Sequence, residues 1–282
     1  MEPALSQAQR VLSFAANFYH ELLTRNVKRF KEIYEYAEKS KIIRGDVKNF
    51  RIGFCPSWED TDYEGRALVK HHCEEFRTYP AFLSKIVQMG LIKEDITKAG
   101  QDICDRLFDT LAGCITFPVY DTEGKIQGVV GRNILESTWM SVGIEFPKWL
   151  YGIHKMQYDI QDKGCVILVE TIFDFFSFYD IICRAGISLV VATTRPEITP
   201  EAIDILSSLA VKDFFIAMDV DELQRQKLRE IIRKKRGQVY YISDSKKGDN
   251  SARKIKEISN LASDPALKRL LKEAAEVAER TG

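Results

Sequence analysis

The sequence lacks any apolar run close to the roughly 20 residues that a membrane span requires, so we expect no membrane partner. It also lacks a CxxC pair, because its six cysteines are scattered at positions 55, 73, 104, 114, 165 and 183. Since no signal peptide is recognisable at the start, we interpret them as reduced thiols of a cytoplasmic protein. A zinc site built from "HHC" at 71–73 with Cys55 matches no established ligand spacing, so no zinc is expected.

A net charge is absent as well, because 41 basic residues balance 41 acidic ones in the 282-residue chain. This balance argues against a protein that is basic throughout. Positive charge is instead concentrated at 225–236, "RQKLREIIRKKR", and at 246–256. Such a run is either a solvated helix face or a local phosphate-binding surface. The second interpretation makes candidate nucleic-acid ligands of Arg233, Lys234, Lys235 and Arg236.

The first part of the chain, residues 1–160, is expected to form an α+β subdomain. Residues 5–40 repeat apolar side chains at helical spacing without glycine or proline, which predicts two amphipathic helices. "FRIGFCP" predicts a short strand that ends in a turn, and "YPAFLSKIVQMGLI" predicts a further helical region. The segment 113–134 places two β-rich arms around "DTEG" and predicts a hairpin.

The second part, residues 161–255, alternates apolar strands with helices and predicts an α/β domain. The expected strands are "CVILVE", "ISLVVAT", "DFFIAMD" and "QVYYIS". Near-continuous apolar strands separated by helices indicate a parallel sheet with helices on both faces. The last segment, 256–282, predicts a helix beginning near Asp264 and Pro265. That helix either packs back on the core or binds a partner.

Acidic residues stand at the ends of these strands, where parallel sheets bind their ligands. Glu170 follows the first strand, Asp219 and Asp221 follow the third, and Asp249 lies past the fourth. Oxygen ligands without histidine or thiolate suit Mg²⁺ or Mn²⁺. A single acid after a strand is usually a helix N-cap or a surface group, but acids at three strand ends of one sheet are harder to explain in this way. Glu170 can meet the two aspartates only if the first and third strands are neighbours.

At these residues the sequence resembles the toprim fold of bacterial-type primases, type IA and type II topoisomerases and some nucleases. The matching segments are "VILVETIFD", "IAMDVDE" and "KKGDN". The resemblance implies that Glu170, Asp219 and Asp221 hold catalytic metal ions. It also implies that Asp174 is a supporting acid and that Asp249 is a later acid beside the metal.

The upstream part resembles the catalytic core of bacterial and phage primases, so that the likeness covers roughly residues 10–255. "FRIGFCPS", "MGLI", "ITFPVYDTEGKIQGVVGR" and "LYGIHKMQ" occur in the order found there. By this resemblance Arg132 and Lys148 contact phosphates. The expected protein is a diverged primase core that lacks the zinc ribbon and the helicase-binding domain.

Several positions depart from the primase pattern. Thr171 stands where the family has glycine, Cys114 where it has arginine, and "STWMS" where a longer groove segment is usual. The resemblance implies metal-dependent synthesis of short RNA primers from nucleoside triphosphates on single-stranded DNA, with a helicase or zinc-ribbon protein as a separate partner. Because of the departures, two alternatives stay open. One is an accessory protein that binds nucleic acid or a replication partner without synthesis, and the other is a toprim-type nuclease.

Overall fold

The structure is a computed structural model that describes residues 5–98, 100–143, 150–183, 186–193, 197–242, 251–262 and 264–281. The chain forms two compact units. Unit 1 comprises Met1–Lys39, Ile43–Val119 and Gly124–Phe146, and unit 2 comprises Ser40–Ile42, Tyr120–Glu123 and Pro147–Gly282. The domain boundaries expected at residues 160 and 255 stay a prediction. Within the described ranges, no helix has the length and apolar character needed to cross a membrane.

Unit 1 contains two sheets. The larger has the strand order β1-β4-β5-β6, and β2 pairs with β3 in the smaller. The strands are β1 (Gly53–Cys55), β2 (Ile92–Glu94), β3 (Leu107–Asp109), β4 (Cys114–Tyr120), β5 (Ile126–Asn133) and β6 (Trp139–Gly143). The expected hairpin is formed by β4 and β5, and the expected strand in "FRIGFCP" is β1, so both predictions are confirmed.

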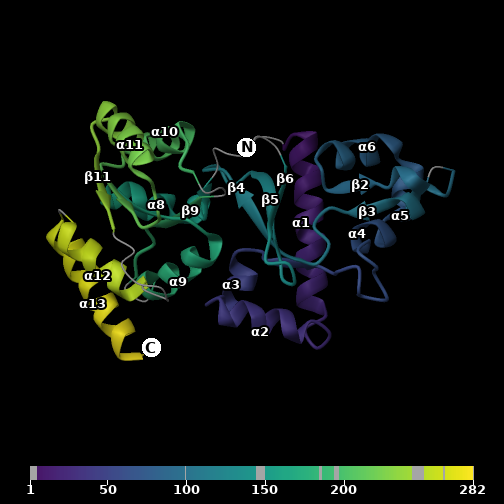
Figure 1. Cartoon of the computed structure of the whole chain (residues 1–282), viewed down its shortest axis with the longest axis horizontal. Helices are drawn as coiled ribbons and strands as arrows, with labels where there is room; N and C mark the ends of the chain where they lie inside the picture. The colour runs from purple at the N-terminus through teal and green to yellow at the C-terminus, as the bar shows by residue number, and fades with distance from the viewer. Residues whose placement is uncertain are drawn as a thin grey trace. The chain divides into compact units, whose positions relative to one another are not determined.

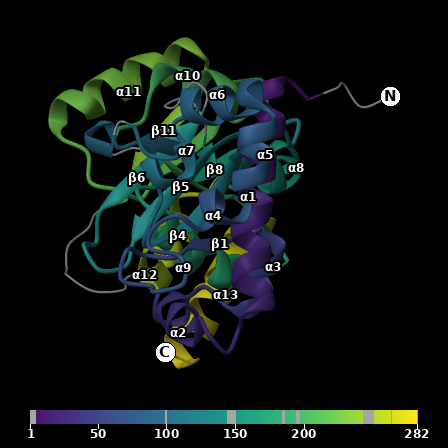
Figure 2. The ribbon, with the colours of Figure 1, turned by 90° about the vertical axis from the view of Figure 1, so that its right-hand side faces the viewer.

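The helices of unit 1 are mostly short apart from the first. They are α1 (Gln7–Arg25), α2 (Lys31–Lys39), α3 (Arg44–Asn49), α4 (Ala67–His71), α5 (Cys73–Thr78), α6 (Pro80–Gln88), the 3₁₀ turn η1 (Ile96–Lys98) and α7 (Ile103–Arg106). Ser6 begins α1 with a capping box, in which its hydroxyl accepts from the Gln9 amide at 3.2 Å. Because α1 buries one apolar stripe, it packs along β1 and β5 (Figure 2). The two predicted amphipathic helices are thus confirmed.

Gly53 lies where β1 meets the backbone of α1. A Cβ atom at this position would lie 2.6 Å from the carbonyl carbon of Tyr19 and 2.8 Å from Oγ1 of Thr116. Next to this contact, Nδ1 of His20 is hydrogen-bonded to the carbonyl oxygen of Ile52 at 2.8 Å. Only glycine therefore allows helix and strand to approach this closely.

A buried carboxyl group ties three elements of unit 1 together. Asp109, at the end of β3, is only 1% exposed. One of its oxygens accepts from the backbone amide of Leu68 at 2.8 Å, and Cys55 donates to the same oxygen at 3.4 Å. Burial raises the pKa of Asp109 from 3.8 to about 7, although these hydrogen bonds oppose the shift. Burial also raises the pKa of Tyr19 and that of Cys55.

This pKa predicts that unit 1 becomes less stable as the pH rises. The folded chain holds the proton of Asp109 up to about pH 7, whereas the unfolded chain releases it near pH 3.8. The stabilisation is therefore complete below pH 3.8 and is lost progressively up to about pH 7. The difference amounts to about 4 kcal/mol. Because the unfolded chain is already mostly ionised at pH 5, urea unfolding at pH 5 and pH 8 should differ by about 3 kcal/mol of this total, and Asp109→Asn should lose most of this pH dependence. Equal pH dependence in the two proteins would contradict the assignment.

Unit 2 is built on a five-stranded sheet in the order β11-β10-β8-β9-β7. The strands are β7 (Leu150–Tyr151), β8 (Cys165–Val169), β9 (Val190–Thr193), β10 (Asp213–Ile216) and β11 (Gln238–Tyr241). β11, β10, β8 and β9 are parallel, and β7 is antiparallel to β9. All four predicted strands are therefore present in a parallel arrangement, to which β7 adds an edge.

Helices lie on both faces of this sheet, as expected for the α/β class. They are α8 (Ile153–Lys163), α9 (Ile172–Cys183), α10 (Pro200–Ser208), α11 (Glu222–Lys234), α12 (Ser251–Leu261) and α13 (Pro265–Thr281). Figure 1 shows α10 and α11 on one side and α9, α12 and α13 on the other. The last helix buries Leu267 and Leu271 and packs against α12 and α9, so it packs back on its own unit.

The turn of the β4–β5 hairpin belongs to unit 2, although the two strands belong mainly to unit 1. Nε2 of Gln157 in α8 donates to the carbonyl oxygen of Thr122 at 2.6 Å. The ring of Tyr120 lies 4.5 Å from that of His154, centroid to centroid. Burial lowers the pKa of His154 to about 4, so this imidazole is neutral at physiological pH. The hairpin turn at residues 120–123 is thus part of unit 2, although the residues before and after it in the sequence belong to unit 1.

The expectation of six reduced thiols is wrong for two of the cysteines. Cys73 and Cys104 form a disulfide, with Cα atoms 5.9 Å apart. Folding brings them together from positions separated by 31 residues, which no spacing rule signals. Cys55, Cys114 and Cys165 are buried free thiols, and Cys183 is an exposed one.

Candidate functional site

Glu170 can share a site with Asp219 and Asp221 only if the first and third predicted strands are neighbours. In the structure these two strands lie next to each other. β8 and β10 pair with Leu168 opposite Ile216, and the ladder continues with the amide of Ala217 donating to the carbonyl of Leu168 at 2.8 Å. Continuing this register brings Glu170 level with Met218, next to Asp219. The carboxyl ends of β8 and β10 therefore present acids at one edge of the sheet.

Glu170 is the first residue after β8, and its side chain is exposed. Its backbone is held by the neighbouring strand, because Oγ1 of Thr193 donates to the carbonyl oxygen of Glu170 at 2.9 Å. Thr193 ends β9 and is only 4% exposed. The carboxylate thus projects from a fixed backbone position. Sequence reasoning did not find this role of Thr193.

The segment Asp219–Asp221 is fixed from both sides while its acids stay exposed. Asp221 is the N-cap of α11, and one of its oxygens accepts from the amide of Gln224 at 2.7 Å. Nε of Arg225 donates to the carbonyl oxygen of Val220 at 3.1 Å. The guanidinium of Arg225 also lies 5.2 Å from the ring centre of Tyr241 in β11. Arg225 therefore links this segment to the edge strand.

Asp174 is engaged in a helix cap at the start of α9. One of its carboxylate oxygens accepts from the backbone amide of Thr171 at 3.0 Å and from the Thr171 hydroxyl at 2.7 Å. In return, the Asp174 amide donates to that hydroxyl at 3.1 Å. The threonine that replaces the family's glycine thus supplies a reciprocal capping box. The supporting role expected for Asp174 near a metal stays a prediction.

These acids do not form a closed cluster. In the described part of the chain, the only three or more ligand atoms from histidine, cysteine or acids that lie within 4.8 Å of one another belong to Cys73, Asp102 and Cys104. The acids at the carboxyl edge nevertheless provide an all-oxygen, exposed donor set, which fits a hard cation that keeps several waters. Asp249 lies outside the described residues.

Arg132 and Lys148 are the two residues near the hairpin that are expected to contact phosphates. The structure describes only the first of them. Arg132 lies in β5 of unit 1, and its guanidinium is 5.1 Å from the ring centre of Trp139 in β6. Its Nε is buried and has no hydrogen-bond partner among the described residues. Lys148 lies outside the described residues. The structure thus gives Arg132 an aromatic neighbour from the shortened "STWMS" segment.

The basic run at the end of α11 lies away from the acids. α11 begins beside Asp221 and ends before β11, whose first residue is at the amino edge of the parallel sheet. A helix of 13 residues separates the two edges by about 20 Å. Lysine and arginine are favourable at a helix C-terminus, where the helix dipole is negative. The run therefore has a structural explanation independent of nucleic acid.

The four cations of this run are all exposed but have different partners. Lys234 pairs with Glu230 at 2.8 Å, and Lys235 pairs with Asp204 at 2.7 Å. Arg233 and Arg236 have no ion pair among the described residues. Arg236 lines a polar cavity of about 480 Å³ together with Lys163 and Lys212. Arg233 and Arg236 are thus the members of the run that remain available to an external anion.

Comparison with known proteins agrees with this fold. No family model matches the chain. Its sequence is similar to the DNA primase of Aquifex aeolicus (strain VF5), with 24% identity over 235 residues that cover 78% of this chain and 40% of that protein. The chain thus spans less than half the length of this relative.

Solved primase structures superpose on almost the whole chain. The crystal structure of the Aquifex aeolicus primase zinc-binding and RNA polymerase domains gives a TM-score of 0.67 at 19% identity, covering 98% of this chain and 73% of that one. The DnaG primase catalytic domain bound to single-stranded DNA gives a TM-score of 0.64 at 17% identity, covering 95% and 81%. The chain therefore has the fold of a primase catalytic domain, and the resemblance stated from the sequence is confirmed.

Proposed function

We propose that this chain is the catalytic core of a primase-like enzyme that joins ribonucleotides into short primers on single-stranded DNA. The observation that carries the proposal is the adjacency of β8 and β10, which brings Glu170 and the pair Asp219 and Asp221 to one sheet edge. The fold is that of primase catalytic domains, one of which was solved with single-stranded DNA. Nucleoside triphosphates would be the second substrate.

We assign the metal site to Glu170, Asp219 and Asp221, with Mg²⁺ or Mn²⁺ as the ion. Asp174 would support it from the start of α9, and Asp249, which lies outside the described residues, would be a further acid beside the metal. The fit is chemical, because the donors are carboxylate oxygens with water access and no thiolate or imidazole among them. A bound ion would stabilise charge that develops on the transferred phosphoryl group and would lower the pKa of the attacking hydroxyl.

The protein's own contribution is to hold these acids in place. Thr193 fixes the backbone at Glu170, and Arg225 fixes the carbonyl between the two aspartates. Such positioning reduces the reorganisation needed when substrates bind. Arg132 and Lys148 would contact phosphates of template or nucleotide. A separate helicase or zinc-ribbon protein would supply template delivery, in a cytoplasmic setting.

Primer synthesis by the purified chain tests this proposal. The chain is incubated with single-stranded DNA, labelled ribonucleoside triphosphates and either Mg²⁺ or Mn²⁺, with and without a zinc-ribbon protein. Labelled oligonucleotides that require template and metal are the expected product. Their absence under every combination would overturn the proposal. Metal-dependent shortening of labelled DNA without nucleotides would indicate a nuclease instead.

A second candidate is a protein that binds nucleic acid or a replication partner without synthesis. It is favoured by the helix caps, because Asp174 and Asp221 each use an oxygen to hold a helix N-terminus. In this case the acids would be retained for stability. The same assay separates the candidates, since this one predicts template binding without product.

The basic run gives a prediction that holds for either candidate. If Arg233 and Arg236 contact a single strand, replacing both with glutamate should make the logarithmic salt dependence of DNA binding shallower by about 1.4, at about 0.7 per lost phosphate contact. Lys234→Gln and Lys235→Gln should change it less, because those cations already pair with acids. Fluorescence anisotropy between 50 and 300 mM salt, a range of about sixfold, measures the slope. An unchanged slope would leave the helix dipole as the reason for the run.

A further inference from the structure

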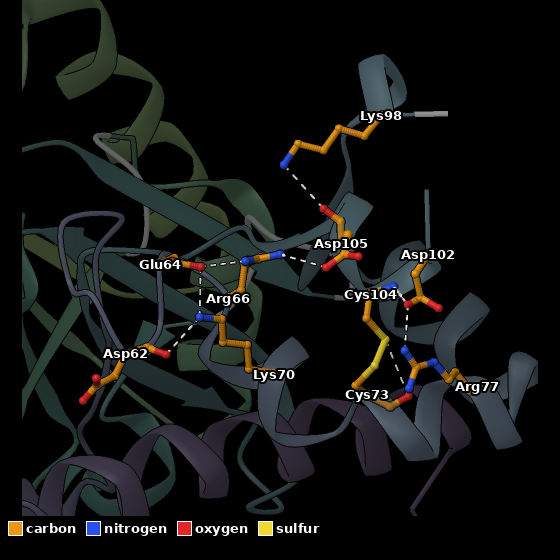
Figure 3. Close-up of polar contacts among 10 residues, drawn as sticks. All are labelled: Asp62, Glu64, Arg66, Lys70, Cys73, Arg77, Lys98, Asp102, Cys104 and Asp105. Atoms are coloured by element: carbon orange, nitrogen blue, oxygen red, sulfur yellow. Dashed lines mark hydrogen bonds and ion pairs between the residues drawn. A yellow bond between two sulfur atoms is a disulfide. The ribbon is translucent and has the colours of Figure 1, made fainter. Parts of the chain in front are cut away.

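The disulfide of unit 1 joins two short helices beside an exposed network of charges (Figure 3). Cys73 is the first residue of α5, and Cys104 lies in α7. Both residues are partly exposed, so small thiols in solution can reach them. The buried thiols Cys55, Cys114 and Cys165 are protected by comparison, and the exposed Cys183 lies in unit 2. Cys73 and Cys104 are thus the accessible pair.

A second link runs beside the disulfide between the same two helices. Asp102 caps α7 by accepting from the amide of Cys104 at 2.9 Å. Arg77, from α5, donates to the same Asp102 oxygen at 2.9 Å. Hydrogen bonding with Arg77 holds the pKa of Asp102 below its ordinary value, so the carboxylate stays charged. The ion pair is exposed, and exposed pairs of this kind contribute little on their own.

Apart from these two links, the segment 100–106 is fixed mainly at its last residue, because the amide of Asp95 donates to the carbonyl oxygen of Arg106 at 2.7 Å and Arg106 pairs with Glu94 at 3.0 Å. Its only helix, α7, has four residues, too few to be stable alone. Lys98 donates to the carbonyl oxygen of Asp105 at 3.4 Å, and Arg66 lies 3.7 Å from the Asp105 carboxylate. The Asp105 side of these contacts is solvent-exposed, whereas the Arg66 side chain is only 19% exposed. The disulfide is therefore the strongest link between α5 and the first part of this segment, whose residues Asp105 and Arg106 line a cleft of about 410 Å³ together with Trp58 and Phe108.

We propose that Cys73 and Cys104 are a reversible redox staple that fastens segment 100–106 to α5. A dithiol reductant opens it by thiol–disulfide exchange: the Cys73–Cys104 bond breaks, each sulfur gains one electron and one proton, and the dithiol becomes a disulfide. In the oxidised chain the first turn of α7 stays docked on α5. In the reduced chain Asp95 and Glu94 still hold the last residue of α7, but only the exposed pair of Arg77 and Asp102 joins its first turn to α5, so this turn separates from α5. This inference does not depend on the proposed primer synthesis.

The same three side chains also offer a competing chemistry. The ligand atoms of Cys73, Asp102 and Cys104 lie within 4.8 Å of one another, so the reduced pair resembles part of a site for a thiophilic cation. The positive charge of Arg77 on Asp102 opposes this, because it repels a cation and occupies the carboxylate. We therefore assign the pair to redox chemistry and treat metal binding as an outcome of the test.

Redox titration of the full chain tests the staple. The protein is equilibrated in mixtures of reduced and oxidised dithiothreitol, free thiols are alkylated, and each cysteine is quantified by mass spectrometry. Cys73 and Cys104 should pass from blocked to alkylated together, while Cys183 is alkylated throughout. A pair that stays reduced in oxidised dithiothreitol would overturn the proposal. So would one equivalent of Zn²⁺ retained by the reduced chain and lost in a Cys73→Ser, Cys104→Ser double variant.

Limited trypsin digestion then measures whether α7 stays docked on α5. Cleavage after Lys98 should be at least about tenfold faster in the reduced chain, because local opening exposes this site. The Cys73→Ser, Cys104→Ser variant should match the reduced chain in either buffer, and Cys183→Ser should match the wild type. Circular dichroism confirms folding, and the Cys73→Ala, Cys104→Ala pair provides a second variant. Equal cleavage of oxidised and reduced wild-type chain would overturn the staple.

Discussion

Glu170→Gln or Asp219→Asn is expected to reduce primer synthesis at least about 100-fold while template binding changes less than about twofold. Each variant removes one negative charge from the carboxyl edge of the parallel sheet and keeps the shape of the side chain. Both side chains are exposed, so neither substitution disturbs the packing of the core. Template-dependent incorporation of labelled nucleotides measures synthesis, and anisotropy with single-stranded DNA measures binding.

Asp213→Asn is a matched control for this experiment. Asp213 begins β10, so it lies on the same strand but at the opposite, amino edge of the sheet. The control should keep full synthesis. Activity retained in both edge variants would contradict the metal assignment, and equal loss in Asp213→Asn would indicate a general effect on the sheet. Thermal unfolding of all three variants within about 2 °C of wild type separates lost chemistry from lost stability.

Gly53→Ala is expected to destabilise unit 1 by about 3 kcal/mol. The added Cβ would lie 2.6 Å from the carbonyl carbon of Tyr19 and 2.7 Å from the amide nitrogen of His20. These are backbone atoms of α1, which cannot rotate away as a side chain can. Relief would require α1 and β1 to separate, which would weaken the hydrogen bond between His20 and Ile52. Urea unfolding followed by circular dichroism measures the change in free energy.

Gly45→Ala provides the opposite control. Gly45 is exposed in α3, and the atom nearest to its added Cβ is 3.9 Å away, in the side chain of Ile43. Since alanine favours helix more than glycine, this change should stabilise the chain by about 0.5 kcal/mol. A Gly53→Ala variant as stable as wild type would show that helix and strand can shift apart at little cost.

The elements that the sequence predicted well have a strong local signal. The helices α1 and α2 follow from apolar spacing without glycine or proline, and β8 follows from five consecutive apolar residues that are all buried. The edge strand β7 has only two residues, Leu150 and Tyr151, so no periodicity can reveal it. Strand order is not encoded locally either, and the adjacency of β8 and β10 became visible only in the folded chain.

The residues of the candidate site also divide into those that have a local sequence signal and those that have none. The acids could be found because they stand where apolar strands end. Their hydrogen-bond partners Thr193 and Arg225 could not, since nothing in their neighbours distinguishes them from other strand and helix residues. The caps are an intermediate case: Thr171 followed by Asp174, and Asp221 followed by Gln224, have the three-residue spacing of a helix start. That spacing could have identified their structural role from the sequence.

The cysteine pair was missed for a different reason. Cys73 and Cys104 are separated by 31 residues, and α6 and β2 lie between them in the chain. Their pairing is a property of the folded unit. The buried acid Asp109 is similar, because its surroundings come from Leu68 and Cys55, which are distant in sequence.

Because the β4–β5 turn belongs to unit 2, the two units cannot be expressed separately by cutting the chain at one position. Residues 120–123 are inserted into unit 2 from the middle of unit 1, and residues 40–42 also belong to unit 2. A gene fragment encoding only residues 147–282 would therefore leave Gln157 without the Thr122 carbonyl and His154 without Tyr120. The two units cannot be exchanged between homologues as separate cassettes, because no single crossover point divides them.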